Sequence, residues 1–171
     1  MLRWQELSES KRMFIKPDYN LKRIYDIDLE ELKSLGVSAL LFDLDSTLMA
    51  SKSGVYSEEI RNWLKKVRKD FFIAVVSNNK NSAYISKVKA ISDFPLLFCA
   101  AKPDIKKVSE FIKQYNLTPE RCALVGDRPL TDILCGKKLG CKTILVDSVT
   151  ADSEKKIVRF VRFLERLSIR R

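Results

Sequence analysis

The sequence predicts an α/β fold, a doubly wound parallel sheet of about five strands, and two observations carry that prediction. Short apolar segments alternate along the 171-residue chain with segments whose apolar residues recur at helical spacing. Strands that alternate with helices form right-handed βαβ units, and helices then cover both faces of a parallel sheet. Ligands bind such sheets at the carboxyl ends of the strands, and polar residues do follow four of the apolar segments.

The expected strands are short runs rich in apolar, β-branched or aromatic residues. They cover residues 38–43, 71–77, 96–99, 122–125 and 143–146. Helical spacing predicts helices over residues 57–68, 81–91, 104–115, 129–139 and 153–167. Ser57 and Asp104 are the expected N-caps of the first and third helices, and Gly140 is expected to end the fourth. The last helix is basic and amphipathic.

The residue types that are missing exclude several kinds of chemistry. The chain has no histidine, and its four cysteines form no Cys-x-x-Cys pair. A Ser-His-Asp triad, a Cys-His pair, a phosphohistidine mechanism and the usual His-rich zinc site are therefore excluded. Acid–base chemistry must rest on carboxylates, lysine, tyrosine or cysteine, and we expect the cysteines to be buried, reduced thiols.

The ends and the charge of the chain bear on its location and partners. No apolar stretch approaches the roughly 20 residues of a transmembrane helix, and the first residues lack the apolar core of a signal peptide. We expect a cytoplasmic protein, with peripheral membrane contact and an organelle lumen or stroma left open. The formal net charge of +10 favours polyanions: nucleic acid, anionic lipid or phosphorylated substrates.

Polar residues follow four of the expected strands and form the candidate site. They are Asp43, Asp45, Thr47, Ser77, Asn78, Lys102, Asp127 and Asp132. Asp43 and Asp45 are two positions apart, so in an extended strand both carboxylates face the same way. Because the carboxyl ends of parallel strands meet at one edge of the sheet, we expect the whole set to lie together.

This set suits the transfer of a phosphoryl group. Carboxylates can hold Mg²⁺, which prefers oxygen ligands. The Ser77 hydroxyl and nearby backbone N–H groups can bind phosphoryl oxygens, and Lys102 supplies positive charge. One carboxylate can attack phosphorus and form an aspartyl-phosphate. The other, two residues on, can protonate the leaving alkoxide and then activate water.

In order and placement these residues resemble the four motifs of the haloacid dehalogenase (HAD) superfamily phosphatases. The matching segments are Asp43-Leu-Asp45-Ser-Thr47, Ser77, Lys102 and Gly126-Asp127-x-x-x-x-Asp132. The resemblance implies a single HAD-like catalytic domain over residues 36–171, preceded by an N-terminal arm over residues 1–35 that could lie at an interface.

The resemblance also implies a role for each acidic residue. Asp43 is the expected nucleophile and Mg²⁺ ligand. Asp45 is the expected general acid and base, and contributes its backbone carbonyl to the metal. Asp127 is expected to ligate Mg²⁺ directly, whereas Asp132 is expected to act through water.

The remaining motif residues are expected to bind the substrate's phosphate. By the resemblance Ser77 binds the phosphoryl group, and Lys102 stabilises the charged site and is counted as catalytic. We also assign Thr47 and Asn78 to phosphate binding.

The spacing of the motifs argues against a cap domain. One expected helix and one expected strand fill the interval from Asp43 to Ser77, and another pair fills the interval from Ser77 to Lys102. Neither interval has room for the cap that many HAD enzymes fold over small substrates. An uncapped site suits a large substrate, a surface-bound substrate, or closure by a partner subunit.

The chain is similar in several segments to the YqeG-like group of HAD subfamily IIIA, whose relatives include phosphatidylglycerophosphate phosphatases. These segments are residues 16–19, 24–28, 125–132 and 143–146. Ser46 stands where asparagine is common and Arg128 where glutamine is frequent. Neither departure removes a catalytic group, but Arg128 could alter substrate choice.

These observations lead to one expected function and two alternatives. We expect a Mg²⁺-dependent phosphatase that acts through an aspartyl-phosphate and converts phosphatidylglycerophosphate to phosphatidylglycerol. The mixed apolar and basic arm and the basic helix over 153–167 could then contact an anionic membrane. The alternatives are a soluble HAD phosphatase for a sugar phosphate, nucleotide or phosphoprotein, and a basic protein associated with nucleic acid or the ribosome. The intact set of catalytic residues argues against a purely binding role.

Overall fold

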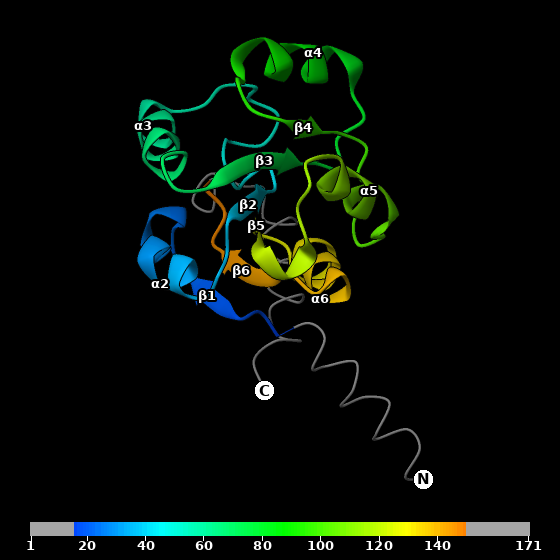
Figure 1. Ribbon diagram of the computed structural model, residues 1–171. Coiled ribbons are helices and arrows are strands. Elements are labelled where there is room, and N and C mark those ends of the chain that lie inside the picture. Colours follow the sequence, from blue (N-terminus) through cyan, green and yellow to red (C-terminus); the bar gives the residue numbers. More distant parts are fainter. Residues whose placement is uncertain (1–15, 150–171) are drawn as a thin grey trace, which may run out of the picture.

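A parallel β-sheet with helices on both faces forms the centre of the protein (Figure 1). The computed structural model describes residues 16–149. Its six strands lie in the order β1-β6-β5-β2-β3-β4, and all neighbours pair in parallel. The strands are β1 (Tyr19–Leu21), β2 (Ala39–Phe42), β3 (Phe72–Val76), β4 (Leu96–Leu97), β5 (Cys122–Gly126) and β6 (Lys142–Val146). The predicted doubly wound α/β fold, of the Rossmann-like kind, is confirmed, with six strands instead of about five.

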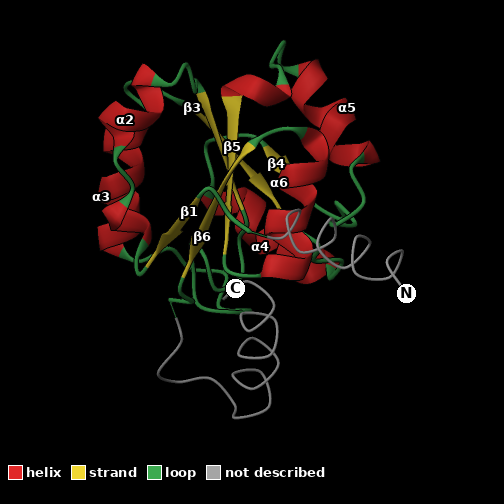
Figure 2. Ribbon diagram, turned by 90° about the horizontal axis from the view of Figure 1, so that it is seen from below, coloured by secondary structure: helices red, strands yellow, loops and turns green. Residues whose placement is uncertain are grey.

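Helices lie on both faces of this sheet (Figure 2). They are α2 (Leu29–Ser34), α3 (Glu58–Val67), α4 (Ser82–Ile91), α5 (Lys106–Gln114) and α6 (Leu134–Leu139), with 3₁₀ turns at Ile24–Asp26 and Pro119–Arg121. Figure 2 shows α2 and α3 on one side of the sheet and α5 and α6 on the other. Successive residues of a strand face opposite sides. Leu40 and Phe42 of β2 accordingly belong to one core cluster, and Ala39 and Leu41 belong to the other.

The sixth strand, β1, comes from residues 1–35, the segment expected from the sequence to form an N-terminal arm. Tyr19 of β1 pairs with Ile144 of β6, and Ile24, Ile27 and Leu32 after it are buried in the core. From residue 16 onward the chain is therefore part of the sheet and its packing. Residues 1–15, and the expected helix over 153–167, lie outside the described residues.

Local signals place most helix ends as expected. Ser57 accepts a hydrogen bond from the backbone N–H of Ile60 and caps α3, and Gly140 ends α6 in the left-handed conformation at φ 86°. Asp104 accepts from the N–H of Lys106 at 2.7 Å, but Ile105 occupies the N-cap position of α5. Between residues 16 and 149, no helix has the length and apolar character needed to cross a bilayer.

The helix expected over 129–139 begins differently from the prediction. Its first turn, Pro129–Ile133, is a π-helix, and α6 follows it. Pro129 has no N–H to donate, and the Asp132 carboxylate accepts from the Arg128 N–H at 3.1 Å. This wider turn keeps Asp132 beside the end of β5, and π-turns are frequent at functional sites.

Candidate active site

The candidate site lies at the carboxyl edge of the three central strands. β2 pairs with β3 on one side and with β5 on the other, so the chain order reverses at β2. This switch point is where ligands bind in open α/β sheets. Asp43 follows β2, Ser77 follows β3 and Asp127 follows β5, so all three side chains start from neighbouring strand ends.

Asp43, Lys102 and Asp132 form a buried ionic cluster at this edge. The Lys102 Nζ lies 2.7 Å from an oxygen of Asp43 and 2.7 Å from an oxygen of Asp132. The Lys102 and Asp132 side chains are each 1% exposed, whereas Asp43 is 14% exposed and so is open to a ligand. Charges this deeply buried are stable only when they are paired.

The surroundings shift the proton affinities of this cluster. Burial raises the pKa of Asp43 to about 6, because the loss of water outweighs the opposing Lys102 charge, and the neighbouring carboxylates of Asp132 and Asp45 add to the rise. Burial alone would lower the pKa of Lys102. The carboxylates of Asp132 and Asp43 outweigh that effect and raise it, so Lys102 stays charged.

Three of the carboxylates are arranged so that they could hold a cation. One oxygen from each of Asp43, Asp127 and Asp132 lies within 4.8 Å of the others. Three negative charges against the single charge of Lys102 leave a formal excess of negative charge in a buried place. An all-oxygen donor set of this kind fits a hard divalent cation such as Mg²⁺.

The three carboxylates are not equally available to such a cation. Asp132 already forms an ion pair with Lys102 through Oδ1, and its Oδ2 accepts a hydrogen bond from the Arg128 N–H. Asp43 meets Lys102 through Oδ1, and Asp127 Oδ1 accepts a 3.4 Å hydrogen bond from the Thr47 hydroxyl. The donor set therefore suits direct ligation by Asp43 and Asp127, with Asp132 holding Lys102 in place.

Gly126 is the residue that lets Asp132 approach the end of β5. A Cβ atom at this position would collide with the Asp132 carboxyl group. The glycine before Asp127 in the fourth motif therefore has a steric reason in this fold.

Asp45 lies apart from the metal triad and is held by three hydrogen bonds. Its Oδ1 accepts from the Lys52 N–H at 2.8 Å and from the Tyr84 hydroxyl at 2.9 Å, and its Oδ2 accepts from the Asn79 amide at 3.1 Å. The loop after Asp45 turns back sharply, with Ser46 at φ 71° and its N–H bonded to the Met49 carbonyl. This turn is what brings Lys52 to Asp45.

The predicted phosphate-binding residues differ in their hydrogen-bond partners. Ser77 is buried and accepts from the Asn79 N–H at 3.1 Å, so its hydroxyl hydrogen is available to an acceptor in the site. Thr47 is buried and donates to Asp127. The Asn78 side chain bonds to both backbone groups of Lys102, at 2.7 and 2.8 Å. Phosphate binding by Asn78 would therefore fall to its backbone N–H.

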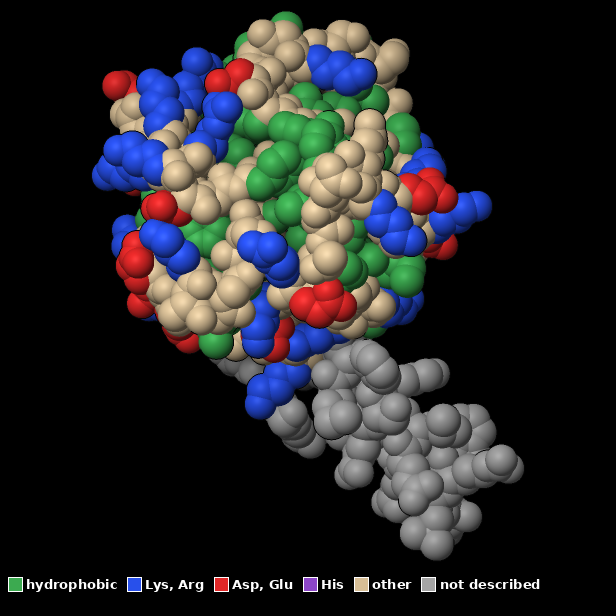
Figure 3. Space-filling view, viewed as in Figure 1, with side chains coloured by type: hydrophobic (Ala, Val, Ile, Leu, Met, Phe, Trp, Pro, Cys, Tyr) green, Lys and Arg blue, Asp and Glu red, His purple; other side chains and the backbone are tan. Residues whose placement is uncertain are grey.

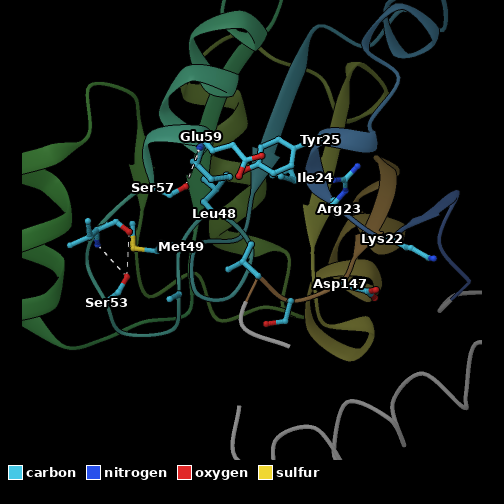
Figure 4. Close-up of a pocket in the computed structure, with 15 residues that line it drawn as sticks. Lys22, Arg23, Ile24, Tyr25, Leu48, Met49, Ser53, Ser57, Glu59 and Asp147 are labelled. Atoms are coloured by element: carbon cyan, nitrogen blue, oxygen red, sulfur yellow. Dashed lines mark hydrogen bonds between the residues drawn. The ribbon is translucent and has the colours of Figure 1, made fainter. Parts of the chain in front are cut away.

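A cavity of about 630 Å³ opens beside the site at the same edge of the sheet (Figure 4). Its walls come from residues 22–25 after β1, residues 48–60 after β2 and residues 147–149 after β6. Met49 joins the cavity to the site, because this residue lines the cavity and its sulfur lies 3.3 Å from the Tyr84 hydroxyl that holds Asp45. A volume in this range matches ordinary small-molecule sites.

Two residues of this arrangement were not among the predicted site residues. Asn79 follows two predicted site residues in a polar run after β3, and this run was a usable signal. Tyr84 lies in the first turn of α4. A partly buried tyrosine on a helix usually packs against the core, so the sequence gives no reason to assign it to the site. No feature of the sequence separates it from other aromatic residues on helices.

Comparison with known proteins agrees with the predicted family. Residues 99–159 match the HAD-hydrolase-like family. The chain is 30% identical over 155 residues to a Bacillus subtilis protein named "Probable phosphatase YqeG", covering 91% of this chain and 90% of the relative. It is 32% identical over 169 residues to the chloroplastic/mitochondrial phosphatidylglycerophosphate phosphatase 1 of Arabidopsis thaliana, covering 94% of this chain but spanning only 49% of that protein.

Solved structures show the same fold at low sequence identity. A HAD-like family hydrolase from Porphyromonas gingivalis superposes with a TM-score of 0.53 at 14% identity, covering 75% of this chain and 98% of that one. An uncharacterized protein from Listeria monocytogenes serotype 4b gives a TM-score of 0.55 at 17% identity, covering 64% of this chain and 78% of that one.

Fold, site and relatives together define a phosphatase of the HAD superfamily. Within that superfamily, the chain belongs to the YqeG-like group.

Proposed function

We propose that this protein is a Mg²⁺-dependent phosphate monoester hydrolase that acts through a phosphorylated Asp43 and removes the terminal phosphate of phosphatidylglycerophosphate. The observation that carries the reaction type is the pairing of a partly exposed carboxylate, Asp43, with a buried lysine 2.7 Å away, with a second carboxylate, Asp45, two residues further along the chain. This set provides a nucleophile, a fixed positive charge and a proton carrier.

The first step forms the phosphoenzyme. A carboxylate oxygen of Asp43 attacks phosphorus, and the bond from phosphorus to the ester oxygen breaks. Asp45 donates a proton to the departing oxygen, so the product leaves as a neutral alcohol. Lys102 holds the Asp43 carboxylate in place, and Ser77 donates its hydroxyl hydrogen to a phosphoryl oxygen. Mg²⁺ held by Asp43 and Asp127 would neutralise negative charge on the phosphoryl group.

The second step restores the enzyme. Asp45, now a carboxylate, takes a proton from a water molecule as the water oxygen attacks phosphorus. The bond between phosphorus and Asp43 breaks, inorganic phosphate leaves, and both aspartates regain their starting states. One residue thus acts first as acid and then as base.

The open entrance supports a large or surface-bound substrate. Between Asp43 and Lys102 the described chain contains only α3, β3, α4 and β4, so no inserted domain in this interval covers the site. Four exposed cations also lie in loops at this edge. They are Lys22 after β1, Lys52 after β2, Lys80 after β3 and Arg128 after β5. These four cations form a positively charged rim around the site, and such a rim favours a phosphate ester at an anionic surface.

The identity of the substrate draws on the relatives and the cavity. The Arabidopsis relative is named a phosphatidylglycerophosphate phosphatase. The lining of the adjacent cavity mixes apolar residues such as Met49 and Val55 with charged ones such as Arg23 and Glu59. A lining of this mixed kind has room for both the polar glycerol and the first acyl carbons of a lipid.

A second basic surface serves as an internal control for the role of the rim. Figure 3 shows lysine and arginine side chains gathered over α3. Because α3 starts at the carboxyl edge of the sheet and runs back to β3, Lys65, Lys66 and Lys69 lie at the opposite edge, away from the site. We expect Lys80→Glu to lower kcat/KM on lipid in anionic vesicles, and Lys66→Glu, the same charge change, to have little effect.

The test of this function is phosphate release with Mg²⁺ from phosphatidylglycerophosphate in mixed micelles, alongside a sugar phosphate, a nucleotide and a phosphopeptide. We expect the lipid to be preferred by roughly 100-fold or more in kcat/KM, with Asp43→Asn inactive on every substrate. Faster turnover of a soluble ester would contradict the lipid assignment. Salt-dependent RNA affinity that survives Asp43→Asn, without turnover of any ester, would support the nucleic-acid alternative.

A further inference from the structure

We propose that Tyr84 is a positioning residue for proton transfer, fixing the Asp45 carboxyl group in the orientation from which it protonates the leaving alcohol. This inference rests on the proposed function, because it assigns Asp45 the acid role. Tyr84 lies on α4, outside the four motifs, and its hydroxyl donates a hydrogen bond to Asp45.

The geometry around Asp45 is the first step of the argument. The carboxyl group is held between two elements, with Lys52 from the loop after β2 on one side and Asn79 and Tyr84 from the β3–α4 segment on the other. Of these donors, Tyr84 and Asn79 are side chains, and the Tyr84 bond is the shorter at 2.9 Å against 3.1 Å. A distance of 2.9 Å lies within the usual range of an O–H···O hydrogen bond.

Tyr84 is itself well fixed, as a positioning residue must be. Its backbone N–H donates to Asn81, which caps α4, at 2.9 Å. Its ring is half-buried against the larger core cluster. Burial raises the pKa of Tyr84, and its hydrogen bond to Asp45 and the charge of that residue raise it further, so the phenol remains a donor.

The hydrogen bonds also distinguish the two oxygens of Asp45. Oδ1 accepts from both Lys52 and Tyr84, which fills its two lone-pair directions. Oδ2 accepts only the Asn79 bond among the hydrogen bonds recorded for residues 16–149. Oδ2 is therefore the oxygen that carries the proton and gives it to the ester oxygen as phosphorus transfers to Asp43. Without the Tyr84 hydroxyl, only the Lys52 N–H and the Asn79 amide hold the carboxyl group, so its orientation is less tightly fixed.

The test compares two aryl phosphates of similar shape, phenyl phosphate and p-nitrophenyl phosphate. Phenolate needs a proton to leave, whereas nitrophenolate leaves readily without one. The value of kcat/KM covers the steps up to release of the alcohol, so it reports phosphoenzyme formation and not the later hydrolysis. We expect Tyr84→Phe to lower kcat/KM about 10-fold for phenyl phosphate, part of the 100-fold or more that a general acid typically supplies. For p-nitrophenyl phosphate we expect a change of less than about twofold.

Tyr56→Phe is the matched control. It removes a hydroxyl that bonds to Ser92 at 2.9 Å in the core, away from the acid, so its effect on the two esters should be equal. Asp45→Asn in the same assay should show the same preference for the nitrophenyl ester as Tyr84→Phe, to a greater degree.

The outcomes separate this inference from the function beneath it. Equal losses on both esters for Tyr84→Phe, or no loss on either, would overturn the positioning role while Asp45→Asn still shows the leaving-group effect. If Asp45→Asn lacks that effect, or wild type hydrolyses neither ester, the proposed mechanism fails and this inference fails with it.

Discussion

Replacing Lys102 by methionine should destabilise the metal-free protein strongly. Lys102 is 1% exposed and its charge lies 2.7 Å from both Asp43 and Asp132. Methionine has a similar length but no charge, so two buried carboxylates lose their counter-ion. Breaking a buried ion pair by removing one partner costs about 3–5 kcal/mol. This is a large share of the roughly 5–15 kcal/mol of a typical domain.

Urea unfolding followed by circular dichroism measures this loss. The experiment is run with a chelator, because a bound cation would take over part of the missing charge. With a slope of about 2 kcal/mol per molar urea, the midpoint should fall by roughly 2 M. Added Mg²⁺ should recover part of the loss, since it binds the folded site more tightly than the unfolded chain.

Lys33→Met is the matched control for this experiment. Lys33 also pairs with two acidic residues, Glu30 and Asp70, but its side chain is 47% exposed. Exposed pairs are worth about 0–1 kcal/mol, so its midpoint should hardly move. A loss for Lys102→Met as small as that of Lys33→Met would refute the claim that the site depends on a buried charge cluster.

Two further substitutions test other parts of the fold. Gly126→Ala should cost roughly 1–3 kcal/mol in urea unfolding and lower activity, because its Cβ would collide with the fixed Asp132 carboxyl; unchanged stability and activity would contradict this. Burial opposes ionisation of Asp18, but hydrogen bonds from Lys137 and Thr143 outweigh it and hold its pKa below the usual 3.8. A lowered folded pKa gives stability that is present above about pH 4 and lost as pH falls further. Asp18→Asn should therefore lower Tm at pH 6 and differ less from wild type as the pH falls below 4; an equal difference at pH 6 and at pH 2 would count against it.

The main outline could be predicted from the sequence because its signals are local and strong. Five of the strands contain or consist of apolar runs, and the polar residues after β2, β3 and β5 fall at strand ends whatever the details of packing. The parallel topology then brings Asp43, Ser77 and Asp127 to one edge. This part of the site follows from strand order and the two-residue period of a strand.

Features that depend on tertiary contacts could not be predicted in the same way. β1 is only three residues long and has a polar residue, Asn20, at its centre, so no apolar run marks it. The π-turn before α6 depends on a hydrogen bond to Asp132. The side chain of Asn78 holds the Lys102 backbone, and Tyr84 meets Asp45 across 39 positions of the chain. Pairings between segments so far apart leave no pattern in either segment alone.

The central claim, that Asp43 carries the phosphoryl group, is tested most directly with Asp45→Asn and p-nitrophenyl phosphate in the presence of Mg²⁺. Nitrophenolate leaves without an acid, but hydrolysis of the phosphoenzyme needs the base that the variant lacks. We predict a burst of nitrophenol equal to the number of enzyme molecules, followed by a stall, with the phosphate located on Asp43 by peptide mass spectrometry. The absence of a burst, or a phosphate on any other residue, would contradict the account.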